Sequence, residues 1–242
     1  MESIRVSQNI KDKVVIGIQA RMSSRRLPGK ALMPILNTTI LGATIQRCIA
    51  SKLKTYILTS LNEEDNLIVK ESKNYGISGV IRGSLNNVLA RYQMLAEQTG
   101  AEYIIRVTAD NPFTDTLGII NLANSIIEKK YLYLIHREKE LPIGYHSELF
   151  NSTELYRSYN KNKLAEEHVT YSIKKNVDIS FAKSLTYHLN KNILQNLKCS
   201  IDEREDYLKA IKLIGLIKGN IFFEDIDLTN KLIKISNKTV IY

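Results

Sequence analysis

The chain has 242 residues, 44% of them hydrophobic, and its 34 Lys and Arg against 25 Asp and Glu give a formal net charge of +9. That length suits one large α/β domain, or one domain with a small appendage, and suffices for a buried core. The positive charge favours an anionic partner. Nucleic acid is not expected, because the basic residues form no run, Trp is absent and no common nucleic-acid-binding signature is present.

The cysteines and the apolar runs indicate a soluble, cytoplasmic protein. Cys48 and Cys199 are isolated, with neither a CxxC motif nor metal-type spacing, as in proteins of reducing compartments. The residues up to Lys13 are polar and charged and lack the apolar centre of a signal peptide. No apolar run approaches membrane-spanning length, so we expect no membrane partner.

The first predicted element is a buried strand that leads into a basic loop. Residues 14–18 form a short, β-branched apolar run, which is typical of a parallel strand covered on both faces. The loop carries Arg21, Arg25, Arg26 and Lys30. Cations held this close together at the carboxyl end of a strand suit a polyphosphate ligand. A solvated basic loop is the alternative, because the loop has neither the Rossmann glycine pattern nor the Walker pattern.

Helical and extended patterns then alternate along the chain. Helices are predicted at 39–50, from about 63 to 76, at 86–99 and at 116–129, and strands at 54–61, 79–82 and 103–108. Such alternation predicts an α/β fold with a mostly parallel, doubly wound sheet, whose ligands bind at the carboxyl ends of the strands. Gly, Pro and a Tyr-rich helix interrupt the alternation between about 141 and 176, and a last amphipathic helix is predicted around 228–235.

Two aspartates are predicted to follow strands at this ligand-binding edge. Asp110 comes just after the strand at 103–108, where Pro112 fixes the turn. Asp202 ends a further predicted strand at 196–202. Two carboxylates opposite a basic loop suit Mg²⁺, which prefers one or two carboxylates together with phosphate oxygens. Both aspartates also have a plainer interpretation as helix caps, above all Asp202, which precedes an acidic helical turn.

Six segments, in order along the chain, resemble one enzyme family. They are IQARMSSRRLPGK at 18–30, RGSLNNVLARY at 82–92, RVTADNP at 106–112, LPIGYHSE at 141–148, EHVT at 167–170 and SIDERED at 200–206. This set resembles the cytidylyltransferases of the spore-coat polysaccharide SpsF type, relatives of the CMP-Kdo and CMP-sialic acid synthetases. Because the segments together span most of the chain, the resemblance does not depend on any single motif.

The resemblance implies a nucleotidyltransferase with a glycosyltransferase-A-like sandwich, which transfers CMP from CTP to a sugar acid or related small anionic acceptor with Mg²⁺ as cofactor. An acceptor oxygen attacks the α-phosphorus in line with departing pyrophosphate. We expect a single domain. Residues about 14–140 bind nucleotide, about 141–176 form an acceptor and dimerisation excursion, and about 177–242 return to the sheet and end in helices. Relatives form dimers through this excursion, so a homodimer is expected.

The matching motifs imply roles for individual residues on the nucleotide side. The triphosphate is expected to bind Arg21, Arg26 and Lys30, with Arg25 left as a surface cation. The base and ribose are expected to lie against Gln19, Ala20, Arg82, Gly83 and Ser84, although Gly83-Ser84 is also an ordinary turn. Mg²⁺ is expected on Asp110 and Asp202. The expected catalytic residues are Arg21, Lys30, Asp110 and Asp202, and Asp110 also faces the nucleotide.

The acceptor side departs from the family pattern. Where relatives usually have Gly-x-Asp-x-Glu, this chain has His146 in place of Asp. We expect His146, Glu148 and His168 to bind the acceptor, and His146 has an ordinary pKa near neutrality that suits binding an acid or accepting a proton. The alternatives are an exposed loop histidine at 146 and a structural one at 168. Asn86 and Asn87 replace an acidic pair, which either removes charge beside the nucleotide or alters a helix cap.

Two other functions are compatible with parts of the sequence. One is a nucleotidyltransferase of the same fold that uses a sugar 1-phosphate or another nucleotide, but such enzymes usually open with a glycine-rich loop, unlike Gln19-Ala20-Arg21. The other is a non-catalytic protein that binds anions or nucleic acid. Carboxylates facing its anion would weaken such a protein unless a metal lay between them, so Asp110 and Asp202 favour the enzyme.

Overall fold

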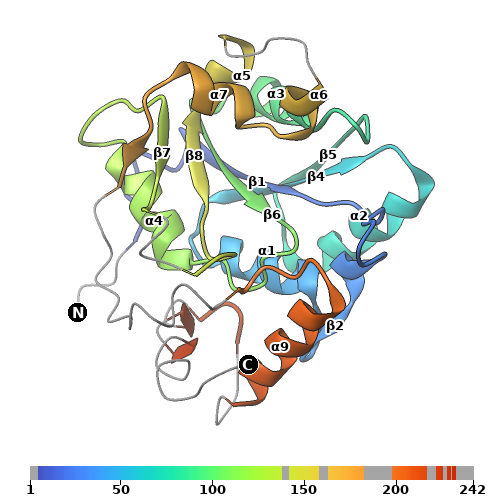
Figure 1. Ribbon diagram of the computed structural model, residues 1–242. Coiled ribbons are helices and arrows are strands. Elements are labelled where there is room, and N and C mark those ends of the chain that lie inside the picture. Colours follow the sequence, from blue (N-terminus) through green and yellow to red (C-terminus); the bar gives the residue numbers. More distant parts are fainter. Residues whose placement is uncertain are drawn as a thin grey trace.

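Seven strands form one central sheet in the computed structural model, in the order β5-β4-β1-β6-β8-β7-β9 (Figure 1). The structure describes residues 5–137, 142–157, 163–182, 198–216, 222–225, 228–229 and 231–232. The strands are β1 Val14–Gln19, β4 Lys54–Ser60, β5 Gly79–Gly83, β6 Tyr103–Thr108, β7 Tyr133–Ile135, β8 Glu148–Asn151 and β9 Ser180–Phe181. A separate two-stranded hairpin joins β2 Pro34–Ile35 to β3 Thr38–Thr39.

The first four strands of this sheet are parallel, and β1 lies between β4 and β6. Its apolar residues are buried on both faces, as the β-branched run predicts. The predicted doubly wound, mostly parallel sheet is therefore confirmed. One strand runs the other way: β8 is antiparallel to both β6 and β7. Residues 148–151, which we assigned to the excursion, thus belong to the sheet.

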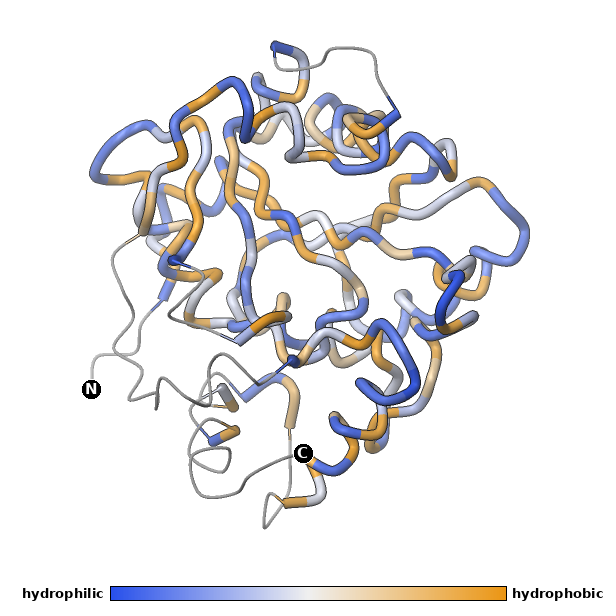
Figure 2. The backbone as a smooth tube through the Cα atoms, viewed as in Figure 1, coloured by the Kyte–Doolittle hydropathy of each residue, from blue (hydrophilic) through white to orange (hydrophobic). Residues whose placement is uncertain are grey.

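Helices cover both faces of the sheet, and hydrophobic residues follow the central strands (Figures 1 and 2). Their bounds are α1 Ile40–Ile49, α2 Asn66–Ser72, α3 Val88–Thr99, α4 Thr116–Ser125, α5 Glu154–Arg157, α6 Lys163–Glu167, α7 Tyr171–Asn176 and α9 Arg204–Gly215, with 3₁₀ turns at Lys30–Leu32, Glu63–Asp65 and Lys73–Tyr75. One core lies between the sheet and α1, α2 and α4, and a second between the sheet and α3, α5 and α7. Among the described residues, no helix is both long and apolar enough to cross a membrane.

Three of the longer helices begin where a polar side chain accepts from one of their first backbone N–H groups. Thr39 caps α1 by accepting from Gly42 N, and Asp115 caps α4 by accepting from Gly118 N. Asn87 caps α3 in the same way, by accepting from Ala90 N at 2.8 Å. Asn87 is therefore a helix cap, which was one of the two interpretations of the Asn pair.

A third core holds α9 and the C-terminal segment against α1. Phe223, Leu228 and Leu232 pack there with residues of α1 and α9. Arg47 of α1 is fully buried and ties this region together, because its guanidinium donates to the carbonyl oxygens of Thr114, Phe223 and Asp225 and to Thr229 Oγ1. The predicted helix at 228–235 is helical at 228–229 and 231–232. Its remaining residues lie outside the described ones.

The predicted strand at 196–202 is wrong for the part that the structure describes. Between 198 and 202 the only strand-type pairing is an isolated bridge from Lys198 to Ile143. Residues 196–197 lie outside the described ranges. The segment instead packs on the turn at Gly144, which has φ +95° and on which a Cβ would come within 2.3 Å of Ser200 N. This close approach holds Asp202 beside the end of β6, because Ile201 N donates to Asp110 O at 2.9 Å.

Candidate active site

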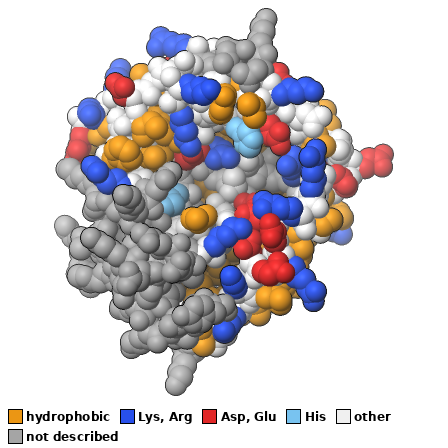
Figure 3. All heavy atoms as spheres, viewed as in Figure 1, with side chains coloured by type: hydrophobic (Ala, Val, Ile, Leu, Met, Phe, Trp, Pro, Cys, Tyr) orange, Lys and Arg blue, Asp and Glu red, His pale blue; other side chains and the backbone are white. Residues whose placement is uncertain are grey.

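The carboxyl ends of the parallel strands open into a cavity of about 700 Å³, which we call the nucleotide-side cavity. Basic and acidic side chains gather on this face of the molecule (Figure 3). The lining residues come from the end of β1 and its loop, the start of α3, the loop after β6, the end of α6 and the segment before α9. They include Gln19, Ala20, Arg21, Arg25, Arg26, Lys30, Asn86, Arg91, Asp110, His168 and Asp202.

Lys30 connects two acidic side chains that line this cavity. Its Nζ donates to Asp110 Oδ2 at 2.6 Å, to Ile201 O at 2.8 Å and to Asp202 Oδ1 at 3.2 Å. Two carboxylates from distant parts of the chain therefore converge on one cation. The sequence placed all three side chains at the same edge of the sheet, and the structure brings them into contact.

Asp202 faces this cluster and does not cap α9. The N-cap of α9 is Glu203, which forms a capping box with Asp206. Burial raises the pKa of Asp202, but hydrogen bonds from Lys198 and the charge and hydrogen bond of Lys30 outweigh it, so the pKa lies below its ordinary value. Asp202 is therefore a carboxylate that stays ionised at neutral pH, as a cation ligand must.

The basic loop reaches the same cavity. Arg26 pairs with Asp202 at 3.1 Å and with Glu203 at 2.9 Å, and Arg21 lies 4.0 Å from Glu167. These pairs are half exposed, so each contributes little to stability and exchanges readily. Arg25 is exposed, as expected of a surface cation, but it also lines the cavity. The loop thus brings three arginines to one anion-sized space.

Asp65, which the sequence did not single out, anchors the basic loop. Its buried carboxylate accepts from Met22 N at 2.7 Å and from Ser60 N at 3.1 Å. A carboxylate that accepts backbone N–H groups holds them in a fixed position. Asp65 is the last residue of the 3₁₀ turn at Glu63–Asp65. It therefore fixes the start of the loop relative to the end of β4.

Three of the five residues expected at the base and ribose, Arg82, Gly83 and Ser84, are placed differently from Gln19 and Ala20, which line the cavity. Arg82 donates to Ser60 O at 2.8 Å, to Asn62 O at 3.0 Å and to Asn66 Oδ1 at 2.7 Å. It holds the turn after β4, and neither it nor Gly83 or Ser84 is among the residues that line the cavity. Asn86, Val88 and Arg91 of the following segment do line it.

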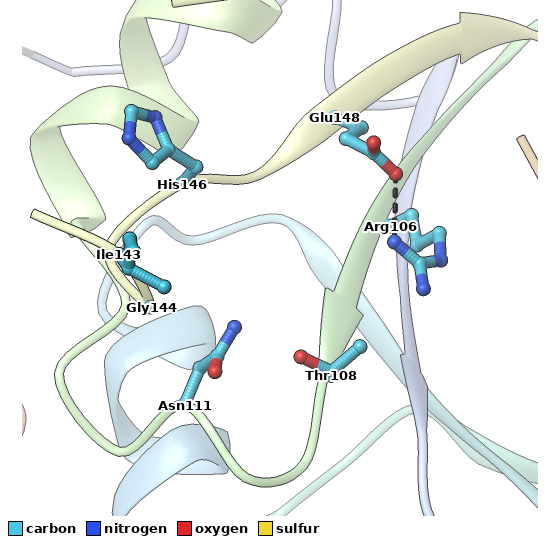
Figure 4. A pocket seen from close by; sticks show the side chains of 7 residues that line it. All are labelled: Arg106, Thr108, Asn111, Ile143, Gly144, His146 and Glu148. Carbon is cyan, nitrogen blue, oxygen red and sulfur yellow. Dashed lines mark hydrogen bonds and ion pairs between the residues drawn. The ribbon is translucent and has the colours of Figure 1, made fainter. Parts of the chain in front are cut away.

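A second cavity of about 410 Å³ adjoins the first, and we call it the acceptor-side cavity. Its lining is Arg106, Thr108, Asn111, Ile143, Gly144, His146 and Glu148 (Figure 4). Thr108 also lines the nucleotide-side cavity, so the two spaces meet at the end of β6. His146 lies in this second cavity, whereas the exposed His168 lines the first. The two histidines expected to bind one acceptor are therefore placed in different cavities.

Glu148 lies under the acceptor-side cavity in a cluster of donors. Its carboxylate accepts from Arg106 Nη1 at 2.7 Å, Tyr133 Oη at 2.8 Å, Lys174 Nζ at 2.5 Å and Thr170 Oγ1 at 3.2 Å. Burial raises the pKa of Glu148, but the charges of Arg106 and Lys174 and their hydrogen bonds bring it down to about 2. Both oxygens are thus engaged within the protein, and the charge that Glu148 presents to a ligand is neutralised.

Arg106 is the cation that faces the acceptor-side cavity. Glu148 holds one end of its guanidinium (Figure 4), and Gln19 Oε1 accepts from its Nε at 3.0 Å. Its pKa is raised above the ordinary value because the charge of Glu148 outweighs burial, which lowers it. Arg106 was not among the predicted site residues, although a charged residue inside the apolar strand at 103–108 is a signal that could have identified it.

The donor set fits a divalent cation that arrives with phosphate groups. Among the described residues, no group of three or more His, Cys, Asp or Glu side chains is arranged to hold a metal ion by itself. Asp110 and Asp202 supply two carboxylates that already share the cation of Lys30. Mg²⁺ commonly takes one or two carboxylates and completes its shell with substrate phosphates and water. The site is therefore suited to Mg²⁺ bound together with a nucleotide.

Comparison with known proteins gives a consistent result. A sequence model of the family described as Cytidylyltransferase matches residues 14–228. The spore coat polysaccharide biosynthesis protein SpsF of Bacillus subtilis is 30% identical over 208 residues, which cover 81% of this chain and 84% of that protein.

Solved structures also resemble the chain. A cytidylyltransferase from Leptospira borgpetersenii has a TM-score of 0.79 at 25% identity, covering 95% of this chain and 99% of the other. A CMP:2-keto-3-deoxy-manno-octonic acid synthetase in complex with CTP has a TM-score of 0.59 at 14% identity, covering 84% and 98%. The second likeness concerns the fold alone.

Proposed function

This chain belongs to the cytidylyltransferase family, and we propose that it transfers CMP from CTP to a small anionic acceptor and releases pyrophosphate. The acceptor class is a sugar acid or a phosphorylated small molecule. The observation that carries the proposal is the contact of Lys30 with both Asp110 and Asp202 at 2.6 and 3.2 Å, in a cavity also lined by Arg21 and Arg26. Cations and carboxylates in one space suit a metal–triphosphate complex.

The proposed binding mode exchanges ion pairs inside the protein for ion pairs with the nucleotide. Arg21, Arg26 and Lys30 leave their carboxylate partners for the triphosphate, while Asp110 and Asp202 would hold Mg²⁺. The ion would neutralise charge that develops on the phosphates as the bond to pyrophosphate breaks. Lys30 then stabilises the leaving group, because an ammonium near the phosphates is worth most where water is excluded, and its side chain is only 14% exposed.

The acceptor-side cavity supports the second half of the proposal. It meets the nucleotide-side cavity at Thr108, so an acceptor oxygen there can approach the α-phosphorus from the side opposite the departing pyrophosphate. Arg106 offers the acceptor a guanidinium that Glu148 and Gln19 already orient. His146 lies at the same cavity and is proposed to bind the acceptor, whereas Glu148 is proposed to act through Arg106.

The biological setting is proposed from the relatives. The Bacillus subtilis relative is named for spore coat polysaccharide biosynthesis, and we propose that the CMP derivative made here feeds surface polysaccharide or glycoconjugate synthesis in the cytoplasm.

We also propose a homodimer, formed through the 141–176 excursion, where Leu164 and Tyr156 expose apolar surface. Sedimentation velocity would test the dimer by giving twice the 27.6 kDa mass.

The experiment for the reaction is a pyrophosphate-release assay. The protein is incubated with CTP, Mg²⁺ and a panel of nonulosonates, Kdo, polyol phosphates and sugar phosphates, and we expect release with one acceptor. Asp110→Ala should abolish it, whereas Asp12→Asn, which changes an exposed carboxylate paired with Lys54, should leave it unchanged. Unchanged release in Asp110→Ala would show that the metal assignment is wrong.

A further inference from the structure

We propose that Arg91 reads the nucleotide base, with its guanidinium donating to the adjacent O2 and N3 atoms of cytosine and so rejecting uracil. This inference rests on the proposed function, because it takes CTP to be the nucleotide. It concerns a residue of α3 that lines the nucleotide-side cavity. Neither the sequence motifs nor the comparisons assign it a role.

Arg91 is a buried cation that the protein satisfies only in part. The residue is 2% exposed. Its Nη1 donates to Leu58 O at 3.2 Å, and its Nε is buried without a hydrogen-bond partner among the described residues. Burial lowers the pKa of this guanidinium. A buried charged donor without a partner is costly, so its retention at a cavity wall indicates a ligand that completes it.

Arg47 shows what a purely structural arginine looks like in the same protein. It is as deeply buried as Arg91, but its guanidinium donates from Nε, Nη1 and Nη2 to carbonyl and hydroxyl oxygens of the protein. It does not line either cavity. The two arginines carry the same charge and differ in their hydrogen bonds. Arg47 donates to the protein from three nitrogens, whereas Arg91 lines the nucleotide-side cavity and its Nε has no partner among the described residues.

The sheet places Arg91 at the distance of a base from the phosphates. Its partner Leu58 lies on β4, whereas Asp110 follows β6, and the strand order β4-β1-β6 separates them by two strand spacings. At about 4.8 Å per spacing, that is roughly 10 Å. A nucleotide with its phosphates at Lys30 and Asp110 therefore extends across the end of β1 and brings its base to Arg91.

The neighbouring backbone leaves room for the guanidinium and fixes its direction. A Cβ on Gly83 would come within 2.9 Å of Arg91 Cγ, so the absent side chain at 83 lets Arg91 pass across the end of β5. Leu58 O accepts from Ala20 N at 3.0 Å as well as from Arg91. The loop after β1 and the guanidinium of Arg91 therefore bind the same carbonyl oxygen, which fixes the position of Arg91 relative to the phosphate-binding loop.

The donor pattern of a guanidinium distinguishes the two pyrimidines. Cytosine presents two neighbouring acceptors, O2 and N3, whereas N3 of uracil carries a hydrogen and is a donor. Parallel N–H groups of an arginine make a bidentate pair with two acceptors and leave one donor facing another when the base is uracil. A site built to make buried hydrogen bonds rejects analogues that cannot make them.

The test is a set of affinities for CTP, UTP and 3-deaza-CTP, each with Mg²⁺, measured by titration calorimetry. In 3-deaza-CTP a C–H group replaces N3. The wild-type protein should bind CTP about 10–100-fold more tightly than either analogue, as is typical of a bidentate contact to a base. Equal affinity for CTP and 3-deaza-CTP would overturn the proposal without any variant, so the test does not depend on a variant that folds.

The variants Arg91→Met and Arg91→Lys sharpen the test. Both should bring the ratio of CTP to UTP affinity close to one, and Arg91→Lys should retain more affinity for both because it keeps the charge without the planar fork. Arg157→Met, which removes an exposed arginine outside the two cavities, should leave the ratio unchanged. If Arg91→Met weakens CTP and UTP by one common factor, Arg91 binds phosphate and the proposal is wrong.

The outcomes separate this inference from the proposed function. A wild-type protein that binds neither pyrimidine nucleotide with Mg²⁺ would contradict both. A wild-type protein that prefers CTP to UTP, in which Arg91→Met keeps that preference, would contradict the inference alone and leave the cytidylyltransferase proposal in place.

Discussion

The two cavities hold their charges in opposite ways. At the nucleotide-side cavity, Arg26 pairs with Glu203, and these two side chains are 59% and 49% exposed. Lys30 contacts two carboxylates there. Beside the acceptor-side cavity, the side chain of Glu148 is 15% exposed and its oxygens accept from Arg106, Tyr133 and Lys174. The loop arginine proposed to change partners is therefore exposed, whereas Glu148, which only positions its neighbour, is buried and accepts from several donors.

The backbone couples these two regions at one point. The Ile143–Gly144 turn lines the acceptor-side cavity, and Cys199 N donates to Ile143 O at 2.7 Å. Asp202 follows three residues later and belongs to the nucleotide-side cluster. A change at this turn therefore reaches a proposed metal ligand without touching a charged residue, which separates positional from electrostatic effects.

The largest expected effect is at Glu148, beside the acceptor-side cavity. Glu148→Gln should lower the free energy of unfolding by about 3–5 kcal/mol, because it removes the charge that pairs with the largely buried Arg106 and with Lys174. Urea unfolding measures it. Glu102→Gln, at an exposed pair 4.0 Å long, should change the free energy by less than about 1 kcal/mol. Equal losses in the two variants would contradict the distinction between the regions.

The pH dependence of the same variant follows from the pKa of Glu148, which is about 2 in the folded protein against an ordinary 4.5. A lowered pKa contributes stability that is present above the ordinary value and is lost as pH falls through the folded value. The difference in unfolding free energy between wild type and Glu148→Gln should therefore be constant above pH 5 and shrink between about pH 4.5 and 2. A difference that stays constant down to pH 2.5 would contradict the pairing.

The next effect concerns Lys30 in the nucleotide-side cavity. Lys30→Met should reduce pyrophosphate release about 10²–10³-fold, as expected for loss of a preorganised charge. The same variant should bind Mn²⁺ more tightly than the wild type when no nucleotide is present, because no ammonium then competes for Asp110 and Asp202. Electron paramagnetic resonance of free Mn²⁺ measures this, with Lys54→Met as the control. Equal Mn²⁺ affinity in wild type and Lys30→Met would show that Lys30 does not compete for the ion.

A smaller effect is expected at the coupling turn. Gly144→Ala should lower the free energy of unfolding by about 1–3 kcal/mol, because its Cβ meets the backbone at Ser200 and its φ is +95°. Gly76→Ala has a φ of +65° but open space around it, so it should cost only backbone strain, about 1 kcal/mol. Thermal unfolding compares the two. If Gly76→Ala is the more destabilising, the turn does not constrain the segment that carries Asp202.

The smallest effect is expected at the start of α9. Glu203→Ala removes the capping box and should cost about 1 kcal/mol. Glu203→Gln keeps a side-chain acceptor for the cap and loses only the ion pair with Arg26, so it should be closer to wild type. Chemical unfolding of both variants gives the comparison, and a larger loss in Glu203→Gln would mean that the ion pair matters more than the cap.

Local signals in the sequence predicted most of the fold. The β-branched run at 14–18 and the alternation of helical and extended periods each act over a few residues, so they can be interpreted without knowing the tertiary structure. The order of strands at the acceptor side could not be predicted in this way. The pairing of β8 with β6, which sets Arg106 opposite Glu148, joins segments that no local pattern relates.

The site residues that could be predicted are those that lie in motifs at the ends of strands. Lys30, Asp110 and Asp202 occur in motifs at the expected sheet edge, and the structure brings them together. Arg91 and Arg106 were overlooked because they interrupt apolar patterns that were otherwise interpreted as core. The strand assigned before Asp202 failed because a short apolar stretch has no length or period that distinguishes a strand from a packed loop.

The central claim is that the cluster around Lys30 binds CTP together with a divalent cation. The most direct measurement is the thermal unfolding of the protein with CTP, UTP, ATP or GTP, each with and without Mg²⁺, because a bound ligand raises the midpoint by mass action. We expect CTP with Mg²⁺ to give the largest shift and to lose most of it when the ion is chelated. A larger shift with a purine nucleotide, or a CTP shift that is the same without Mg²⁺, would contradict the account.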